Sequence, residues 1–131
     1  MPEESFDHDR RTRGNEVLAT LWGVEDGAAA YRELEARFSG SLAELTNDFC
    51  LGDIWSRPAL DRRMRSLLVL AALTAQGATQ PLRAHVKGAL HHGATREEVR
   101  EVFVQMAAYA GFPLATTAAE IAEEVFREMD S

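Results

Sequence analysis

Apolar residues recur every three or four positions along almost the whole chain, and this spacing restricts the fold more than any other feature. It places the apolar side chains on one face of an α-helix, whereas the alternation of apolar and polar residues that marks a strand is missing. Alanine and leucine also outweigh valine, isoleucine and threonine. The sequence therefore predicts an all-α protein.

Glycines, prolines and capping motifs divide the periodic segments into six or seven helices. Two capping boxes, Ser41 with Glu44 and Thr95 with Glu98, each predict a helix start. Residues 1–11 are expected to be disordered, and residues 12–131 are expected to form one domain. The expected helices run from Thr12 to Leu21, from Gly27 to Gly40, from Ser41 to about Gly52, from about Pro58 to Ala75, from about Pro81 to Gly93, from Thr95 to about Gly111, and from Pro113 onward.

Two of these helices carry expectations about burial. The helix that starts at Ser41 is expected to bury Leu42, Leu45 and Phe49. The helix from Pro58 to Ala75 is apolar most of the way round and is therefore expected to be central in the fold. Its apolar residues include Leu67, Leu68, Leu70, Ala71 and Leu73.

Composition restricts the class of protein. The net charge of −7 argues against nucleic acid or an anionic membrane as the main partner. The only cysteine, Cys50, rules out a disulfide within the chain and favours a reducing compartment, where it is expected to be a small buried apolar group. The N-terminal segment does not resemble a signal peptide, and the longest apolar run is too short to span a bilayer. We expect a soluble cytoplasmic protein.

The candidate site residues are polar or aromatic side chains that do not fit a plain helical surface: Trp55, Arg57, Arg65, His85, Gln105 and Tyr109. Each also has an ordinary structural interpretation. A lone histidine among apolar neighbours is more often a hydrogen-bonded core residue than a catalyst. Arginines in loops and charged runs are usually solvated, a tryptophan is usually a packing anchor, and Gln105 and Tyr109 are one turn apart and able to bond nearby backbone. Spacing alone leaves both interpretations open.

Motifs for metals and cofactors are missing. The histidines His85, His91 and His92 lack the i, i+4 spacing that puts two metal ligands on one helix face. His91 and His92 instead lie in the last turn of their helix, where the helix dipole favours positive charge. The C-x-x-C, G-x-G-x-x-G, P-loop and G-x-S-x-G motifs are also absent. An enzyme with this sequence is expected to use neither a metal nor a cofactor.

Three motifs follow one another in one register within residues 52–115, about half of the chain. They are W-x-R-P-x-L-x-x-x-x-R-S from Trp55, H-x-x-x-A-L-x-x-G-x-T-x-x-E from His85, and Y-x-G-x-P from Tyr109. In this pattern the chain resembles the carboxymuconolactone decarboxylase family. The pair His91–His92 stands where that family often has polar amides.

The resemblance extends to the wider superfamily of alkylhydroperoxidase D-like proteins. Their signature is C-x-x-C followed by a histidine four residues after the second cysteine. Ala78 and Pro81 stand at the two cysteine positions, and His85 stands at the histidine position. The resemblance therefore implies an alkylhydroperoxidase D-like helical bundle without thiol peroxidase chemistry, and it favours a site role for His85.

The family's named reaction is the decarboxylation of 4-carboxymuconolactone to the enol-lactone of 3-oxoadipate, in the breakdown of protocatechuate. The electrons of the broken bond delocalise into the lactone, so no cofactor is needed as an electron sink. The resemblance implies that His85 donates a proton to carbon or a hydrogen bond to the enolate oxygen. Arg57 and Arg65 are then the clamps for the carboxylate and the lactone. Trp55 and Tyr109 wall the pocket, with Gln105 as a further substrate contact.

Two alternatives to this small anionic lactone substrate stay open. In the first alternative, the chain is an enzyme of the same fold that acts on another lactone, a quinone or a keto acid in secondary metabolism. In the second, it is a non-catalytic oligomer that binds a ligand. In each case the resemblance implies a homo-trimer or a homo-hexamer.

Overall fold

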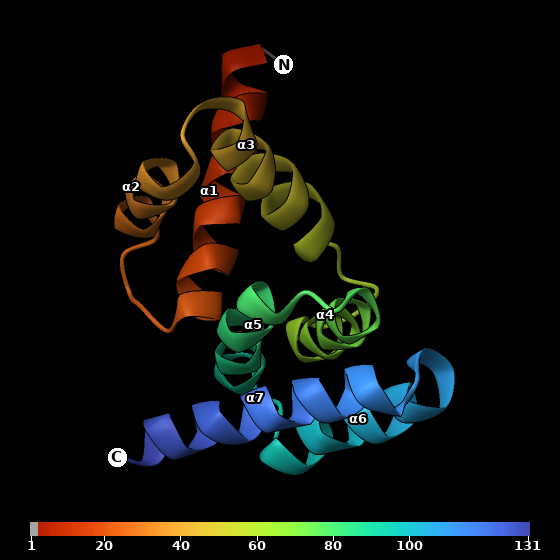
Figure 1. The fold of residues 1–131 in the computed structure, drawn as a ribbon. Coiled ribbons are helices and arrows are strands. Elements are labelled where there is room, and N and C mark those ends of the chain that lie inside the picture. Colours follow the sequence, from red (N-terminus) through yellow and green to blue (C-terminus); the bar gives the residue numbers. More distant parts are fainter. Residues whose placement is uncertain (1–2) are drawn as a thin grey trace. The chain divides into compact units, whose positions relative to one another are not determined.

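The structure is a computed structural model that describes residues 3–131, with side chains from residue 9 onward. Within that range the chain forms seven α-helices and one π-helical segment and has no strand, so the predicted all-α class is confirmed (Figure 1). The elements are α1 (Glu3–Trp22), α2 (Gly27–Phe38), α3 (Gly40–Glu44), η1 (Leu45–Trp55), α4 (Arg62–Gln76), α5 (Thr79–His91), α6 (Arg96–Ala110) and α7 (Phe112–Asp130).

The chain divides into two compact units, of which the first ends at Leu60 and the second runs from Asp61 to Ser131. Helices α1, α2 and α3 and segment η1 belong to the first unit, and helices α4 to α7 form the second. One domain over residues 12–131 and disorder over residues 1–11 stay predictions, and the first two of those residues lie outside the described part of the chain.

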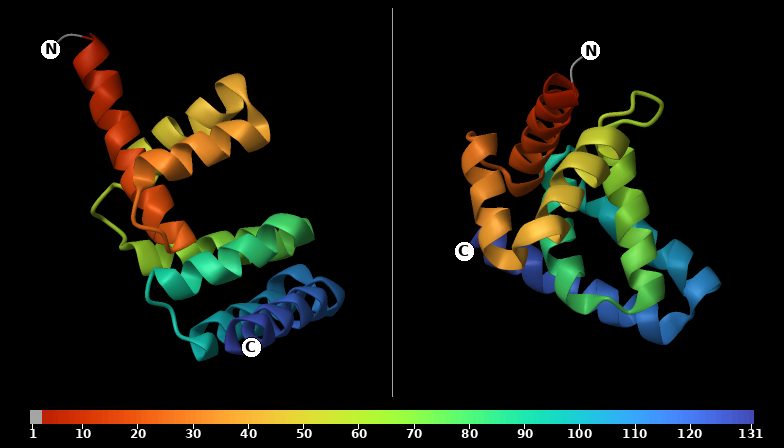
Figure 2. Two further views of the ribbon diagram at one scale, coloured as in Figure 1. Left: turned by 90° about the vertical axis from the view of Figure 1, so that its left-hand side faces the viewer. Right: turned by 90° about the horizontal axis from the view of Figure 1, so that it is seen from above.

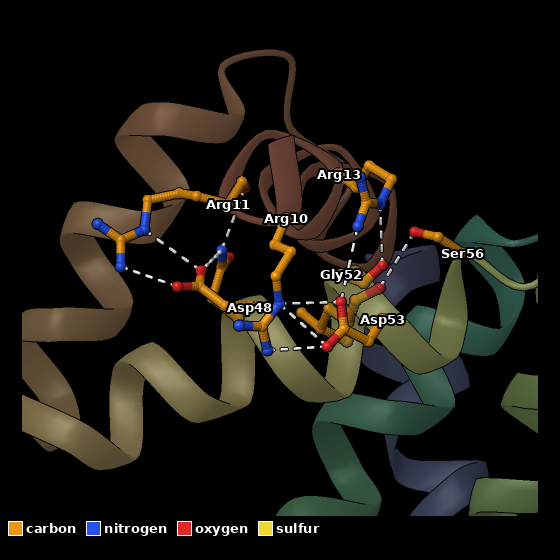
Figure 3. Close-up of polar contacts among 9 residues, drawn as sticks. Arg10, Arg11, Arg13, Asp48, Gly52, Asp53 and Ser56 are labelled. Atoms are coloured by element: carbon orange, nitrogen blue, oxygen red, sulfur yellow. Dashed lines mark hydrogen bonds and ion pairs between the residues drawn. The ribbon is translucent and has the colours of Figure 1, made fainter. Parts of the chain in front are cut away.

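Helix α1 begins well before the predicted start at Thr12. Arg10 Nη2 lies 2.8 Å from Asp53 Oδ2 on η1 (Figure 3). Arg11 Nη2 lies 2.8 Å from Asp48 Oδ2 on the same segment. These ion pairs attach the turn that precedes Thr12 to η1. The spacing of apolar residues contains no sign of such a charge contact, which explains why the predicted helix is too short.

Two glycines allow α1 and η1 to approach each other closely. A Cβ atom on Gly14 would lie 2.0 Å from the backbone oxygen of Asn47, and one on Gly52 would lie 2.4 Å from the backbone oxygen of Arg10. The side chain of Asn47 is fully buried in this crossing and donates a hydrogen bond of 3.3 Å to the backbone oxygen of Arg11. Any larger residue at either glycine would push the two segments apart.

The predicted capping box of Ser41 and Glu44 is wrong. Helix α3 begins at Gly40, so Ser41 lies inside its first turn rather than at its N-cap. The N-cap is Ser39, which has a positive φ of 56° and makes no capping hydrogen bond with its side chain. The backbone turn between α2 and α3 therefore sets this helix start, and the S-x-x-E pattern does not.

The predicted burial of Leu42, Leu45 and Phe49 is also wrong, since these side chains are 61%, 58% and 51% exposed. Beyond α3 the chain continues as the π-helix η1, in which hydrogen bonds join residues i and i+5. The faces of this segment no longer follow the 3.6-residue period on which the prediction rested. The buried face is made by residues four apart: Ala43, Asn47, Leu51 and Trp55.

The second unit has two layers of helices. Helices α4 and α5 form one antiparallel pair, and α6 and α7 form a second pair packed against it (Figure 2). The hydrophobic core lies between the two pairs, as expected for helices with one apolar face each. Its buried residues are Leu70, Leu82, Val86, Ala89, Ala94, Val99, Phe103, Ala118, Ala122, Val125 and Phe126.

Local caps set the helix starts in this unit. The predicted capping box of α6 is confirmed, because Thr95 Oγ1 accepts from the Glu98 N–H and Glu98 Oε1 accepts from the Thr95 N–H, both at 3.0 Å. Helix α4 starts after Asp61 rather than at Pro58. The Asp61 side chain accepts a hydrogen bond of 2.8 Å from the Met64 N–H and so caps the helix.

Helix α4 contacts α5, α6 and α7, as expected for a central helix of this unit, but it is not buried on all sides. Leu70 is fully buried, but Leu68 is half-exposed. The other buried residues of this helix are polar: Ser66 and Thr74. The Thr74 hydroxyl donates to the backbone oxygen of Leu70 at 2.7 Å, which satisfies it within the helix. Ser66 is bonded differently, to a side chain at the end of α5.

Candidate active site

His85 lies in the middle of α5, and its side chain is largely buried. Its Nδ1 atom is buried and has no hydrogen-bond partner in the described part of the chain. Burial lowers the pKa of the imidazole below its usual value, so the ring is neutral near pH 7. Most buried polar atoms in proteins are hydrogen-bonded. An unpaired buried nitrogen is an exception to this rule, which marks His85 as a candidate functional residue.

A second histidine is bonded to the fully buried Ser66. His92 is the C-cap of α5, and its Nδ1 atom lies 2.9 Å from Ser66 Oγ on α4. The backbone N–H of His92 also donates to the Gly88 oxygen at 2.9 Å, which holds the residue at the helix end. The ring is therefore fixed from two sides, by its own helix and by α4.

The helix dipole favours a positive charge on His92, but the environment of the ring in the structure does not. Burial, and after it the nearby charges of Arg62, His91 and His85 in that order of effect, together lower the pKa of His92 to about 4. The ring is therefore neutral at pH 7. Loss of hydration and a neighbouring guanidinium outweigh the dipole at the C-terminus of α5.

These residues lie on matching faces of one helix pair. Arg62 and Ser66 are one turn apart on α4, and His85 and His92 are about two turns apart along α5. At about 1.5 Å of rise per residue, the two histidines are separated by about 10 Å along the helix axis. Arg65 is half-buried on α4, three residues after Arg62 and beside the same face.

The other predicted arginine and the tryptophan belong to the first unit. Arg57 is exposed, just beyond η1. Trp55 is the last residue of η1 and is buried, and its indole N–H bonds the thiol of Cys50. Cys50 is itself exposed, contrary to the expectation that it is buried. These contacts give Trp55 a packing role within its unit, and its predicted role as a pocket wall stays a prediction.

Gln105 and Tyr109 both lie on α6, one turn apart. Gln105 lines a groove of about 410 Å³ between α4 and α6, together with Met64 and Leu68 of α4. Met64 and Leu68 point to a different side of α4 from Ser66, about half a turn away. Tyr109 is 80% exposed. Arg65 thus shares α4 with Ser66 and Arg62, whereas Gln105 lines the groove on another side of that helix.

The second unit also has a small cavity of about 150 Å³ where the end of α4 meets the start of α5 and α7. Ala78, at one of the two signature cysteine positions, lines it beside apolar and threonine side chains. No histidine or arginine lines this cavity, so it offers an anionic substrate no charged partner. We therefore place the candidate site at the histidines and not in this cavity.

Sequence reasoning missed Ser66, His92 and Arg62 as members of this site. Ser66 was visible as the last residue of the first family motif, and His92 was visible as half of an unusual histidine pair. Their contact spans 26 positions of the chain, so no local pattern reports it.

The described part of the chain holds no group of three or more His, Cys, Asp or Glu side chains placed to bind a metal ion. None of the helices described there combines the length and the apolar character needed to cross a bilayer.

Residues 41–124 match the sequence model of the carboxymuconolactone decarboxylase family. A 4-carboxymuconolactone decarboxylase of Acinetobacter baylyi is 32% identical over 123 residues, which are 94% of this chain and 91% of that protein. A nitrosuccinic acid decarboxylase of Metarhizium robertsii is 36% identical over 86 residues, 66% of this chain and 60% of that protein. An uncharacterised 15.0 kDa protein of Paracoccus denitrificans is 42% identical over 81 residues, 60% of each chain.

Proposed function

This chain belongs to the carboxymuconolactone decarboxylase family and is a decarboxylase of that family, and we propose that its substrate is 4-carboxymuconolactone. The product is the enol-lactone of 3-oxoadipate, in the breakdown of aromatic compounds. The near full-length similarity to a 4-carboxymuconolactone decarboxylase supports this substrate. The family resemblance supports a cytoplasmic location and assembly as a homo-trimer or homo-hexamer. Analytical ultracentrifugation tests the assembly, because a 14.5 kDa monomer alone would contradict it.

The reaction places one main demand on the protein. When carbon dioxide leaves, the electron pair of the broken C–C bond moves into the lactone and forms a dienolate. Negative charge therefore accumulates on the former carbonyl oxygen until a proton is added to carbon. A hydrogen-bond donor fixed near that oxygen lowers the barrier, because it binds the charge more strongly in the transition state than in the substrate.

The buried Nδ1 atom of His85 is the observation that carries the proposal. Because burial lowers the pKa of this histidine, the neutral imidazole is the form present near pH 7. A neutral ring is a poor source of a whole proton and a good hydrogen-bond donor. Of the two roles expected for His85, donation to the enolate oxygen therefore fits better than protonation of carbon.

The arginines supply the positive charge that a dicarboxylate substrate requires. Arg65 is the better supported clamp, because it lies in the same unit as His85 and beside the same helix pair. Arg57, Trp55 and Tyr109 enter the proposal through the family motifs in which they stand, as the second clamp and the pocket walls. Gln105 stays a proposed substrate contact on the same ground.

The test is a decarboxylation assay with freshly prepared 4-carboxymuconolactone, following ultraviolet absorbance and release of carbon dioxide. Replacing His85 by Ala is expected to lower the rate about a hundredfold or more. Lys87→Ala, at an exposed position of the same helix, is the matched control and is expected to keep the rate. No turnover by the folded protein would reject the substrate, and a loss below about tenfold in His85→Ala would remove His85 from this role.

A second candidate substrate is favoured by the similarity to a nitrosuccinic acid decarboxylase. Loss of the carboxyl group next to a nitro group also moves an electron pair onto oxygen, here as a nitronate. The same buried donor would stabilise that oxyanion. Nitrosuccinate is therefore the second compound in the assay, and a higher kcat/KM for it would replace the lactone as the proposed substrate.

A further inference from the structure

The contact between Ser66 and His92 combines a fully buried hydroxyl with a half-buried ring. In the tautomer of His92 that carries its proton on Nε2, the Ser66 hydroxyl donates to Nδ1. The Nε2–H group then points away from Ser66, on the opposite side of the ring. The serine thus fixes the orientation of the ring, and its hydroxyl, which can donate as well as accept, is compatible with this tautomer.

Arg62 adds a permanent positive charge at the same place. It precedes Ser66 by one turn on α4, and its charge acts on the His92 ring. A guanidinium with five N–H donors and an oriented imidazole N–H together match the two oxygens of a carboxylate. A neutral ring beside an arginine suits an anion, since it donates a hydrogen bond without adding charge repulsion to the arginine.

We propose that Arg62 and His92, with Ser66 as the positioning residue for His92, form a subsite for the carboxylate that the substrate retains. The inference rests on the proposed function, because it assigns one end of the same site. His85 meets the lactone oxygen about two helical turns along α5, and the retained carboxymethyl group reaches the Arg62–His92 subsite. The substrate class is therefore a small ring or chain with a carboxylate remote from the one it loses.

A kinetic test separates this role from a purely structural link between α4 and α5. His92→Leu and Arg62→Gln are each expected to raise KM about tenfold or more and to change kcat much less, because a charge-assisted hydrogen bond to a carboxylate is lost. His92→Asn keeps a side-chain N–H donor and is expected to restore most of the affinity. Arg63→Gln removes the same charge from the neighbouring position, where Arg63 pairs with Glu98, and is the matched control.

Ser66 has its own pair of variants. Ser66→Ala removes the hydroxyl that orients His92 and is expected to raise KM severalfold. Ser66→Thr keeps a hydroxyl, so its KM is expected to stay below that of Ser66→Ala. Thermal melting of each variant, followed by circular dichroism, reports the loss of folding separately. Lower melting temperatures with an unchanged KM in all of these variants would show a structural link only and would overturn the subsite.

A binding test does not depend on turnover. The probe is (5-oxotetrahydrofuran-2-yl)acetate, a saturated lactone that keeps the carboxymethyl group and lacks the carboxyl group to be lost, compared with its methyl ester by calorimetry. The acid is expected to bind the unmodified protein at least about tenfold more tightly than the ester, and Arg62→Gln is expected to abolish that difference. Equal binding of acid and ester, or binding of the acid that survives in both Arg62→Gln and His92→Leu, would overturn the subsite.

The two proposals fail in different ways. If the protein does not decarboxylate 4-carboxymuconolactone but binds the acid in an Arg62-dependent manner, the substrate is wrong and the carboxylate subsite stands. If it decarboxylates the lactone with the same KM in the Arg62 and His92 variants, the substrate stands and the subsite is wrong.

Discussion

Acidification is expected to destabilise this protein through His92. The pKa of this histidine is lowered from 6.5 to about 4, first by burial and then by Arg62 and the neighbouring histidines. The folded state therefore holds the ring neutral at a pH where the unfolded chain binds a proton. The stabilisation from His92 is complete above pH 6.5 and is lost progressively as the pH falls from there towards 4.

The size of this effect follows from the shift of the pKa. A change from 6.5 to about 4 corresponds to about 3.4 kcal/mol of unfolding free energy, at about 1.36 kcal/mol for each pKa unit. Because the ring is only half-buried, solvent screens part of this energy. We therefore expect His92 to account for about 1–2 kcal/mol between neutral pH and about pH 4.5.

Urea denaturation of the unmodified protein and of His92→Asn, each at about pH 7.5 and about pH 4.5, measures the effect. Asparagine does not titrate, so the variant lacks the contribution of this one group. His85, whose pKa is also lowered by burial, acts in the same direction in both proteins and cancels in the comparison. If both proteins lose the same unfolding free energy on acidification, the assigned environment of His92 is wrong.

Two further predictions concern stability. Gly14→Ala places a Cβ atom 2.0 Å from the backbone oxygen of Asn47 and is expected to cost about 2 kcal/mol or more in a urea melt. Glu16→Ala, at an exposed position of the same helix, is the control and is expected to stay within about 0.5 kcal/mol. Thr95→Ala removes the side-chain half of the capping box with Glu98 and is expected to lower the unfolding free energy by about 1 kcal/mol. An unchanged midpoint for Gly14→Ala or Thr95→Ala would contradict the contact on which that prediction rests.

The sequence by itself determined the fold class, most helix boundaries and the family. Helical periodicity and the capping box of Thr95 with Glu98 each depend on residues only a few positions apart, so both can be recognised from the sequence alone. The family resemblance carried by the three motifs, and not a local interaction, favoured His85 as a site residue. The failures came where a local rule did not hold: the 3.6-residue period in the π-helix that exposes Leu45 and Phe49, and the cap proposed at Ser41.

Only the tertiary structure decided the state of the histidines and their partners. Ser66 and His92 are 26 positions apart and meet because α4 and α5 pack as an antiparallel pair. The lowered pKa of His85 and His92 comes from burial, which depends on everything packed around each ring. A histidine in a sequence is a group that titrates near neutrality. Desolvation and a neighbouring arginine make it a neutral hydrogen-bond donor, because both raise the free energy of its charged form.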